Sequence, residues 1–162
     1  GVHQKGLVID VNQALDGEGP FSPERTGSLP VNHIINACFS GKYTKEQIKK
    51  MIVGEGGVVA YLGTNDAYEV ETKAKEGSKE HAFIQSAMAY QVAKEIGAAA
   101  TVLNGKVDAI ILTGGIAKGK PFDDEVIERV KFIAPVEVYA GEDEMGALAM
   151  NATMFLNNEE YK

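Results

Sequence analysis

The order of apolar and polar residues predicts one long helix and one buried strand as the main elements of the chain. Apolar residues between Ser78 and Asn104 repeat at three- and four-residue steps, which is the period of an amphipathic helix. The run from Val107 to Leu112 is almost continuously apolar and β-branched, as in a strand that helices cover on both faces of a parallel sheet. We therefore expect the long helix to pack against a central sheet that contains this strand.

Shorter elements are expected in the amino-terminal part of the chain. Residues 1–11 form two arms around a Gln-Lys-Gly turn, which predicts a β-hairpin with a short first arm. Residues 14–30 are rich in Gly, Pro and Ser and have neither a helical nor a strand period. An irregular segment of this length in a compact domain is usually functional or disordered, and Phe21 and Leu29 favour order because they can be buried.

Helix signals follow this irregular segment. Residues 31–40 predict a short helix that faces the core and buries Cys38. A capping box that begins at Thr44 opens the next helix. Residues 58–62 form a short buried segment, and good caps begin a polar helix over residues 64–77.

The carboxyl-terminal part alternates helix and strand. Asp123 or Asp124 is expected to cap a helix that Pro135 ends, and residues 136–139 form a further strand. The last helix carries apolar residues on one side over residues 145–156. With 162 residues and this order of elements, the chain is expected to be one α/β domain.

Gly114 and Gly115 lie at the carboxyl end of the predicted strand. Residues without a Cβ can take positive φ and approach a flat ring or a phosphate closely. Ligands of open α/β sheets bind beyond the carboxyl ends of the strands. A pair of glycines is also an ordinary turn, so the pattern alone leaves a binding loop and a structural turn both open.

Composition narrows the expected partners and compartment. A net charge of −7 argues against nucleic acid or an anionic membrane surface as the main partner, since either requires a basic face. One cysteine excludes an internal disulfide framework and fits a reducing cytosol. The chain has neither a long apolar run nor a leader pattern, so we expect a cytoplasmic protein.

Three polar positions are candidates for chemistry, and each has a structural alternative. Arg25 lies in the irregular segment, where its guanidinium could bind a phosphate or carboxylate, or pair with Glu24 or Asp16. Asp66 could contact a nucleoside or serve only as a helix N-cap. The acidic residues 142–144 could hold Mg²⁺ or only stabilise the first turn of the following helix.

Several longer strings resemble the butyrate kinases of the acetate kinase family, in order along essentially the whole chain. These strings are residues 14–30, 38–44, 60–66, 87–97, 111–117 and 139–145. The resemblance implies a ribonuclease-H-like, actin-like ATPase fold in two lobes, each with a central mixed sheet flanked by helices. It also implies that residues 1–162 are the carboxyl-terminal nucleotide-binding lobe, which we expect to be inactive without the amino-terminal lobe.

The resemblance assigns residues to the phosphate and adenosine parts of the site. Arg25 matches the loop arginine that meets the transferring phosphoryl group. Gly114, Gly115 and Ile116 match the adenosine loop, in which the isoleucine lies against the ring. Asp10 lies on the hairpin that is expected near the phosphates.

A second segment and a metal position are implied in the same way. Asp66, Ala67 and Tyr68 match another part of the family that contacts adenosine. Tyr68 stands where many relatives have an arginine, so an aromatic ring could stack there instead of a polar contact. Glu144, with Asp143 beside it, matches the acidic position that holds Mg²⁺.

The expected ligands and partners follow from the resemblance. They are ATP or ADP, Mg²⁺ and butyrate or a related short-chain carboxylate, which would be converted to an acyl phosphate. A homo-oligomer, a dimer or larger, is expected through the long helix. The alternative is a regulatory or structural module that binds nucleotide without transferring phosphate. Arg25 separates the two, because binding alone requires no arginine aimed at the γ-phosphate.

Overall fold

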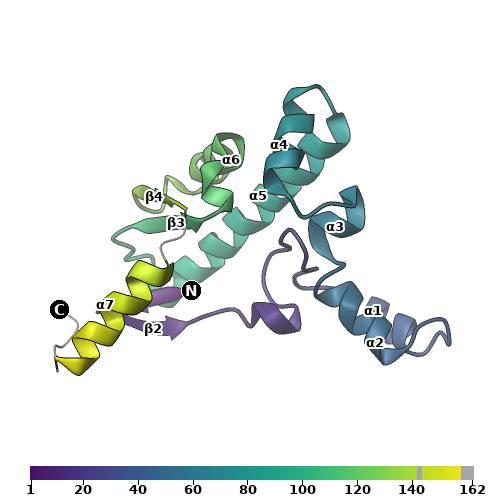
Figure 1. Cartoon of the computed structure of the whole chain (residues 1–162), viewed down its shortest axis with the longest axis horizontal. Helices are drawn as coiled ribbons and strands as arrows, with labels where there is room; N and C mark the ends of the chain where they lie inside the picture. The colour runs from purple at the N-terminus through teal and green to yellow at the C-terminus, as the bar shows by residue number, and fades with distance from the viewer. Residues whose placement is uncertain (142–143, 158–162) are drawn as a thin grey trace.

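The computed structural model describes residues 1–141 and 144–157, and the long helix α5 (Lys79–Ala100) crosses the molecule diagonally (Figure 1). It packs mainly against α4 (Ala67–Lys75) and α6 (Lys120–Val130). Their contact forms the core, which includes the buried residues Val70, Ile84, Met88, Ala89, Ala93, Val126 and Val130. The predicted long helix is confirmed, but its principal partners are helices, although Ile110 of a strand joins the same core.

Two separate two-stranded sheets take the place of the single mixed sheet expected from the sequence. Strands β1 (Val2–Gln4) and β2 (Leu7–Asp10) form the predicted antiparallel hairpin. Strands β3 (Ile110–Gly114) and β4 (Val136–Ala140) pair in parallel and in register. No strand among the described residues joins one pair to the other. The expected central mixed sheet is therefore not formed by this part of the chain.

Helices cover only one face of the β3–β4 pair, which corrects the expectation of cover on both faces. Ile110 is buried, whereas the next residue, Ile111, is 63% exposed. On β4, Tyr139 is likewise 63% exposed. Successive strand residues point to opposite faces, so this alternation means that the core lies on one side. A continuous apolar run indicates a strand, but it does not show that both faces have a partner in the same chain.

Helices α1 (Val31–Cys38) and α2 (Lys45–Ile52) form a pair at one end of the molecule, away from α5 (Figure 1). The capping box is confirmed, because Thr44 and Gln47 exchange hydrogen bonds of 2.8 and 3.2 Å. The expectation that α1 faces the core is wrong. No residue of α1 is buried, and Cys38 is exposed. The amphipathic period correctly predicted that these residues form a helix, but it did not predict that the helix lies outside the core.

The irregular segment is ordered and is held between α5 and α3 (Gly57–Leu62). It contains one short 3-10 turn, η1 (Ala14–Asp16). Phe21 is buried as expected, its ring packs edge-on against Tyr61, and its backbone N–H donates to Gln91 Oε1 at 3.1 Å. Leu29, expected to be buried, is 41% exposed. One aromatic anchor therefore attaches the segment to the core.

Helix α6 begins earlier than the sequence suggested. Its N-cap is Gly119, and Pro121 lies in the first turn, where a missing backbone N–H costs nothing. Neither Asp123 nor Asp124 is the cap. Asp123 is instead buried on the inner side of the helix, with its Oδ1 making no hydrogen bond to the described residues. Burial first, and the charge of Asp124 second, raise the pKa of the Asp123 carboxyl above its ordinary value.

Replacing Asp123 by asparagine is expected to stabilise the protein at neutral pH. The pKa of Asp123 is higher in the folded state than in the unfolded state. The free energy of unfolding therefore falls as the pH rises from the unfolded-state pKa through the folded-state pKa, and this loss is complete at neutral pH. The advantage of Asp123→Asn is therefore expected to shrink in acid, where the carboxyl is protonated in both states. Urea unfolding of both proteins at several pH values measures it. A difference that does not change with pH would contradict the role of the charge.

The last described helix, α7 (Glu144–Leu156), has an exposed apolar side. Met145 and Phe155 on it are 79% and 82% exposed. The predicted helix is thus present, but its apolar side is not covered by the described residues. None of the helices in this part of the chain is both long and apolar enough to cross a membrane.

Candidate functional site

A cavity of about 170 Å³ lies between α4, α5 and the beginning of α6. Short segments from four other parts of the chain complete its walls. The lining residues are Pro23, Val58, Asn65, Ala67, Tyr68, Val70, Glu71, Gln85, Met88, Gly115, Ile116, Lys118, Gly119 and Phe122. Most of these side chains are apolar, so the cavity suits a flat, largely apolar group with a few polar contacts.

Helical spacing explains how three helices share this cavity. Residues of one helix that are three or four positions apart lie on the same face. Helix α4 contributes Ala67 and Glu71, and α5 contributes Gln85 and Met88. The start of α6 contributes its N-cap glycine and Phe122. The cavity is therefore a product of how these helices pack.

The two glycines at the end of β3 have different conformations. Gly114 has φ +90°, and its carbonyl accepts a hydrogen bond of 3.1 Å from Gly141 N. Gly115 has φ −64°, which any residue can adopt, so the expected positive φ holds only for Gly114. The turn leads into η3 (Ile116–Lys118), and Gly115 and Ile116 line the cavity, whereas Gly114 does not.

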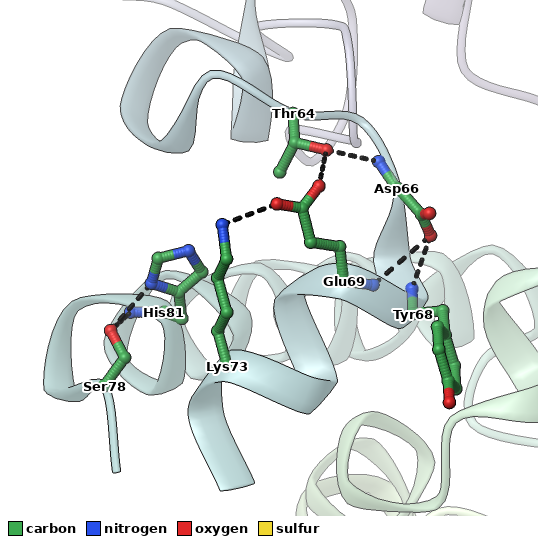
Figure 2. Close-up of polar contacts among 7 residues, drawn as sticks. All are labelled: Thr64, Asp66, Tyr68, Glu69, Lys73, Ser78 and His81. Atoms are coloured by element: carbon green, nitrogen blue, oxygen red, sulfur yellow. Dashed lines mark hydrogen bonds and ion pairs between the residues drawn. The ribbon is translucent and has the colours of Figure 1, made fainter. Parts of the chain in front are cut away.

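Asp66 is the N-cap of α4, as one of the two interpretations proposed. Its Oδ1 accepts hydrogen bonds from Tyr68 N at 2.9 Å and Glu69 N at 3.3 Å (Figure 2). Thr64 Oγ1 accepts a hydrogen bond from Asp66 N and donates one of 2.7 Å to the Glu69 carboxylate. The same carboxylate forms an ion pair of 2.5 Å with Lys73. Figure 2 shows the Tyr68 ring pointing away from this network. Asp66 thus shapes the turn, and Tyr68 faces the cavity.

The network predicts a pH effect at Glu69. The hydrogen bonds from Lys73 and then from Thr64 lower the pKa of the Glu69 carboxyl below its ordinary value of 4.5. The ionised Glu69 carboxylate therefore stabilises the folded state at pH values above the ordinary pKa. This stabilisation is lost as the pH falls through the lower pKa of the folded state. We expect Glu69→Gln to reduce the melting temperature slightly at neutral pH and to equal the wild type in acid. Thermal unfolding over a pH series checks this, and a gap that persists in acid would contradict it.

Arg25 is fixed through its backbone and not through an ion pair. Its carbonyl accepts a bond of 3.0 Å from Ser22 N, its N–H donates to Ser22 Oγ at 3.1 Å, and it bridges to Val53. The alternative pairing with Glu24 or Asp16 is not found among the described residues. Arg25 Nε is buried without a hydrogen-bond partner in this part of the structure. Arg25 does not line the cavity, but Pro23 of the same loop does.

The other expected site residues either lie apart from the cavity or have side chains that the structure does not describe. Asp10 ends β2, pairs with Val2 and is exposed. Asp143 lies outside the described residues, and Glu144 begins α7 with a side chain that is not described. Among the side chains that the structure describes, no group of three or more His, Cys, Asp or Glu residues could hold a metal ion. The expected Mg²⁺ position is therefore untested.

Four polar lining residues were not anticipated from the sequence as site residues. These are Asn65, Glu71, Gln85 and Lys118. Glu71 could have been found from the helical period, because it follows the expected Ala67 by four residues on α4. Gln85 had no such signal, since its place depends on how α5 packs against α4 and α6.

Comparison with known proteins identifies the family of the chain. A sequence profile of the acetokinase family matches residues 18–141. The chain belongs to this family, which confirms the resemblance at the level of the family.

Two solved structures share the fold. The crystal structure of acetate kinase from Porphyromonas gingivalis matches with a TM-score of 0.73 at 19% identity, covering 85% of this chain and 41% of that one. The structure of a propionate kinase from Francisella tularensis subsp. tularensis SCHU S4 matches with a TM-score of 0.68 at 21% identity, covering 81% and 39%. The chain thus spans about two fifths of the length of these relatives.

Proposed function

We propose that this chain is the nucleotide-binding, carboxyl-terminal lobe of a kinase that transfers the γ-phosphoryl group of ATP to a short-chain carboxylate. The acceptor that the sequence strings favour is butyrate, and the reaction is reversible. The observation that carries the proposal is a single cavity lined by Ala67 and Tyr68, by Gly115 and Ile116, and by Pro23 of the Arg25 loop. Two segments far apart in the sequence, which the resemblance separately assigns to adenosine, meet there with the loop that it assigns to the phosphoryl group.

The dimensions of the cavity support a base-binding role. Sites for drug-sized ligands are roughly 300–1,000 Å³, so a cavity of about 170 Å³ is suited to one part of a nucleotide. Its apolar walls fit the faces of a purine ring, and the 77% exposed Tyr68 lies at its mouth. In this proposal the base enters the cavity, and the ribose and phosphates lie outside it.

Arg25 is proposed to act on the phosphoryl group. A carboxylate oxygen of the acceptor attacks the γ-phosphorus while the bond to the bridging oxygen of ADP breaks, and ADP leaves with that electron pair. Charge spreads over the three equatorial oxygens during this transfer, and a fixed guanidinium stabilises it. Arg25 forms no ion pair with the described residues and its Nε lacks an acceptor there, so a phosphoryl oxygen would supply the partner that this N–H lacks. Mg²⁺ would neutralise phosphate charge, with Glu144 and Asp143 as the residues proposed to hold it.

The second candidate function is a module that binds nucleotide without transferring phosphate. Arg25 argues against it, because its buried Nε has no hydrogen-bond partner among the described residues, and nucleotide binding alone has no need of an arginine held for the transferring phosphoryl group. We also propose that the protein assembles as a homo-oligomer, a dimer or larger, through α5.

The test is to assay this lobe joined to the amino-terminal lobe of the family. Acyl hydroxamate formation from ATP and butyrate is expected, with isobutyrate, propionate and acetate as comparison acceptors. The chain alone is expected to give no product. Nucleotide binding by the joined protein without any product would favour the second candidate, and no binding would contradict both.

A further inference from the structure

Glu71 places a carboxylate in the largely apolar cavity. It lies one turn beyond Tyr68 on α4, and its side chain is only 15% exposed, whereas Tyr68 is 77% exposed. Tyr68 therefore lies at the mouth and Glu71 further inside. A Cβ built on Gly119 at the start of α6 would lie 2.8 Å from Glu71 Oε2, so this oxygen is directed toward the α6 wall.

The known contacts of Glu71 do not account for its enclosure. Oε1 pairs with Lys75, whose side chain is 63% exposed. An ion pair four residues apart on a helix, with one partner largely exposed, contributes little to stability. An ionised carboxylate can accept about four hydrogen bonds, and Lys75 is the only partner of Glu71 among the described residues. The carboxylate thus keeps acceptor capacity inside the cavity.

Resting on the nucleotide-binding function proposed above, we propose that Glu71 selects adenine by accepting a hydrogen bond from its 6-amino group. If the base alone fits the cavity, the donor that reaches an enclosed carboxylate belongs to the base. Hypoxanthine and guanine carry a carbonyl oxygen at this position, which a carboxylate repels. Gln85 on the α5 wall has a half-buried amide, which can donate to an adjacent ring nitrogen of adenine.

The experiment compares ADP and IDP, which differ at the 6-position, by equilibrium binding to wild-type protein and to Glu71→Gln. Wild type is expected to prefer ADP by at least ~10-fold. Glu71→Gln is expected to weaken ADP binding by roughly 10- to 100-fold, because a bond to a charged group is lost. The same variant is expected to bind IDP more tightly, since an amide N–H can donate to the carbonyl oxygen. Equal losses for both nucleotides would indicate a structural role and overturn the proposal.

Matched variants separate recognition from folding. Lys75→Met removes the same ion pair from the other side and is expected to keep the preference for ADP. Gly119→Ala is expected to displace the carboxylate without removing it, and so to lower the preference in the same direction as Glu71→Gln. Loss of the preference in Lys75→Met, or its full retention in Gly119→Ala, would overturn the proposal.

A third nucleotide, 2′-deoxy-ADP, distinguishes the base from the ribose. Glu71→Gln is expected to weaken 2′-deoxy-ADP and ADP equally. If only ADP is weakened, Glu71 binds the ribose and the proposal is overturned. If the wild-type protein binds ADP and IDP equally, the proposed role of Glu71 is overturned, but the proposed nucleotide-binding function is not. Wild-type protein that binds neither nucleotide overturns the proposed function as well.

Discussion

Replacing Arg25 by alanine is expected to lower acyl phosphate formation by ~10³-fold or more while leaving ADP affinity nearly unchanged. The reason is that the guanidinium is proposed to stabilise charge that develops on the phosphoryl group only during transfer, whereas the cavity that is proposed to bind the base does not include Arg25. Hydroxamate formation by the joined lobes measures transfer, and equilibrium binding of ADP measures affinity.

Two further arginine variants sharpen this test. Arg25→Lys keeps a charge but loses the planar fork, so it is expected to recover only part of the activity. Arg129→Ala removes an arginine that pairs with Glu125 on α6 and lies over the Tyr90 ring, and it is expected to keep full activity. Full activity in Arg25→Ala, with wild-type binding, would refute the proposed role of Arg25 in transfer.

The elements that the sequence predicted well are those fixed by local interactions. The Thr44 capping box forms as expected, and Ser78 caps α5 by accepting a bond from His81 N at 3.4 Å. The hairpin turns at Lys5 and Gly6, both with positive φ. Such signals need only neighbouring residues, so they can be recognised without knowledge of the packing.

Burial was predicted less well, because it depends on what lies opposite each element. Cys38 and Ile111 lie in apolar patterns that are ordinary for core elements, yet both are exposed. Asp123 shows the reverse case, since a residue expected at a helix start lies inside the core. Its position followed from Pro121, which moves the start of α6 toward Gly119. Periodicity identifies a face but does not identify its partner.

The candidate site was anticipated in part for the same physical reason. Ala67, Tyr68, Gly115 and Ile116 were expected from short strings, and the structure brings them together around one cavity. Glu71 was not expected, because its enclosure arises from the approach of α6 to α4. Short sequence strings thus predicted the residues at the mouth of the cavity. The residues of its inner wall could not be predicted in this way, because their positions depend on how three helices pack together.

Replacing Gly57 by alanine is expected to destabilise the protein by about 3 kcal/mol or more, and to disturb the Arg25 loop with it. Gly57 begins α3 with φ +59°, and a Cβ there would lie 1.9 Å from Ser22 O and 2.6 Å from Arg25 O. Both contacts are with backbone, which cannot move aside as a side-chain end can. Urea unfolding is expected to show the loss of stability, and the hydroxamate assay a loss of transfer.

Gly63→Ala provides a matched control at the other end of the same helix. Gly63 has a similar φ of +73°, but nothing lies within 4 Å of the position of a Cβ. Its replacement therefore adds only backbone strain of roughly 1–2 kcal/mol and leaves the Arg25 loop in place. The difference between the two variants isolates the clash with residues 22–25. Equal losses of stability and of transfer would mean that Gly57 does not hold this loop, and that Arg25 is positioned by other contacts.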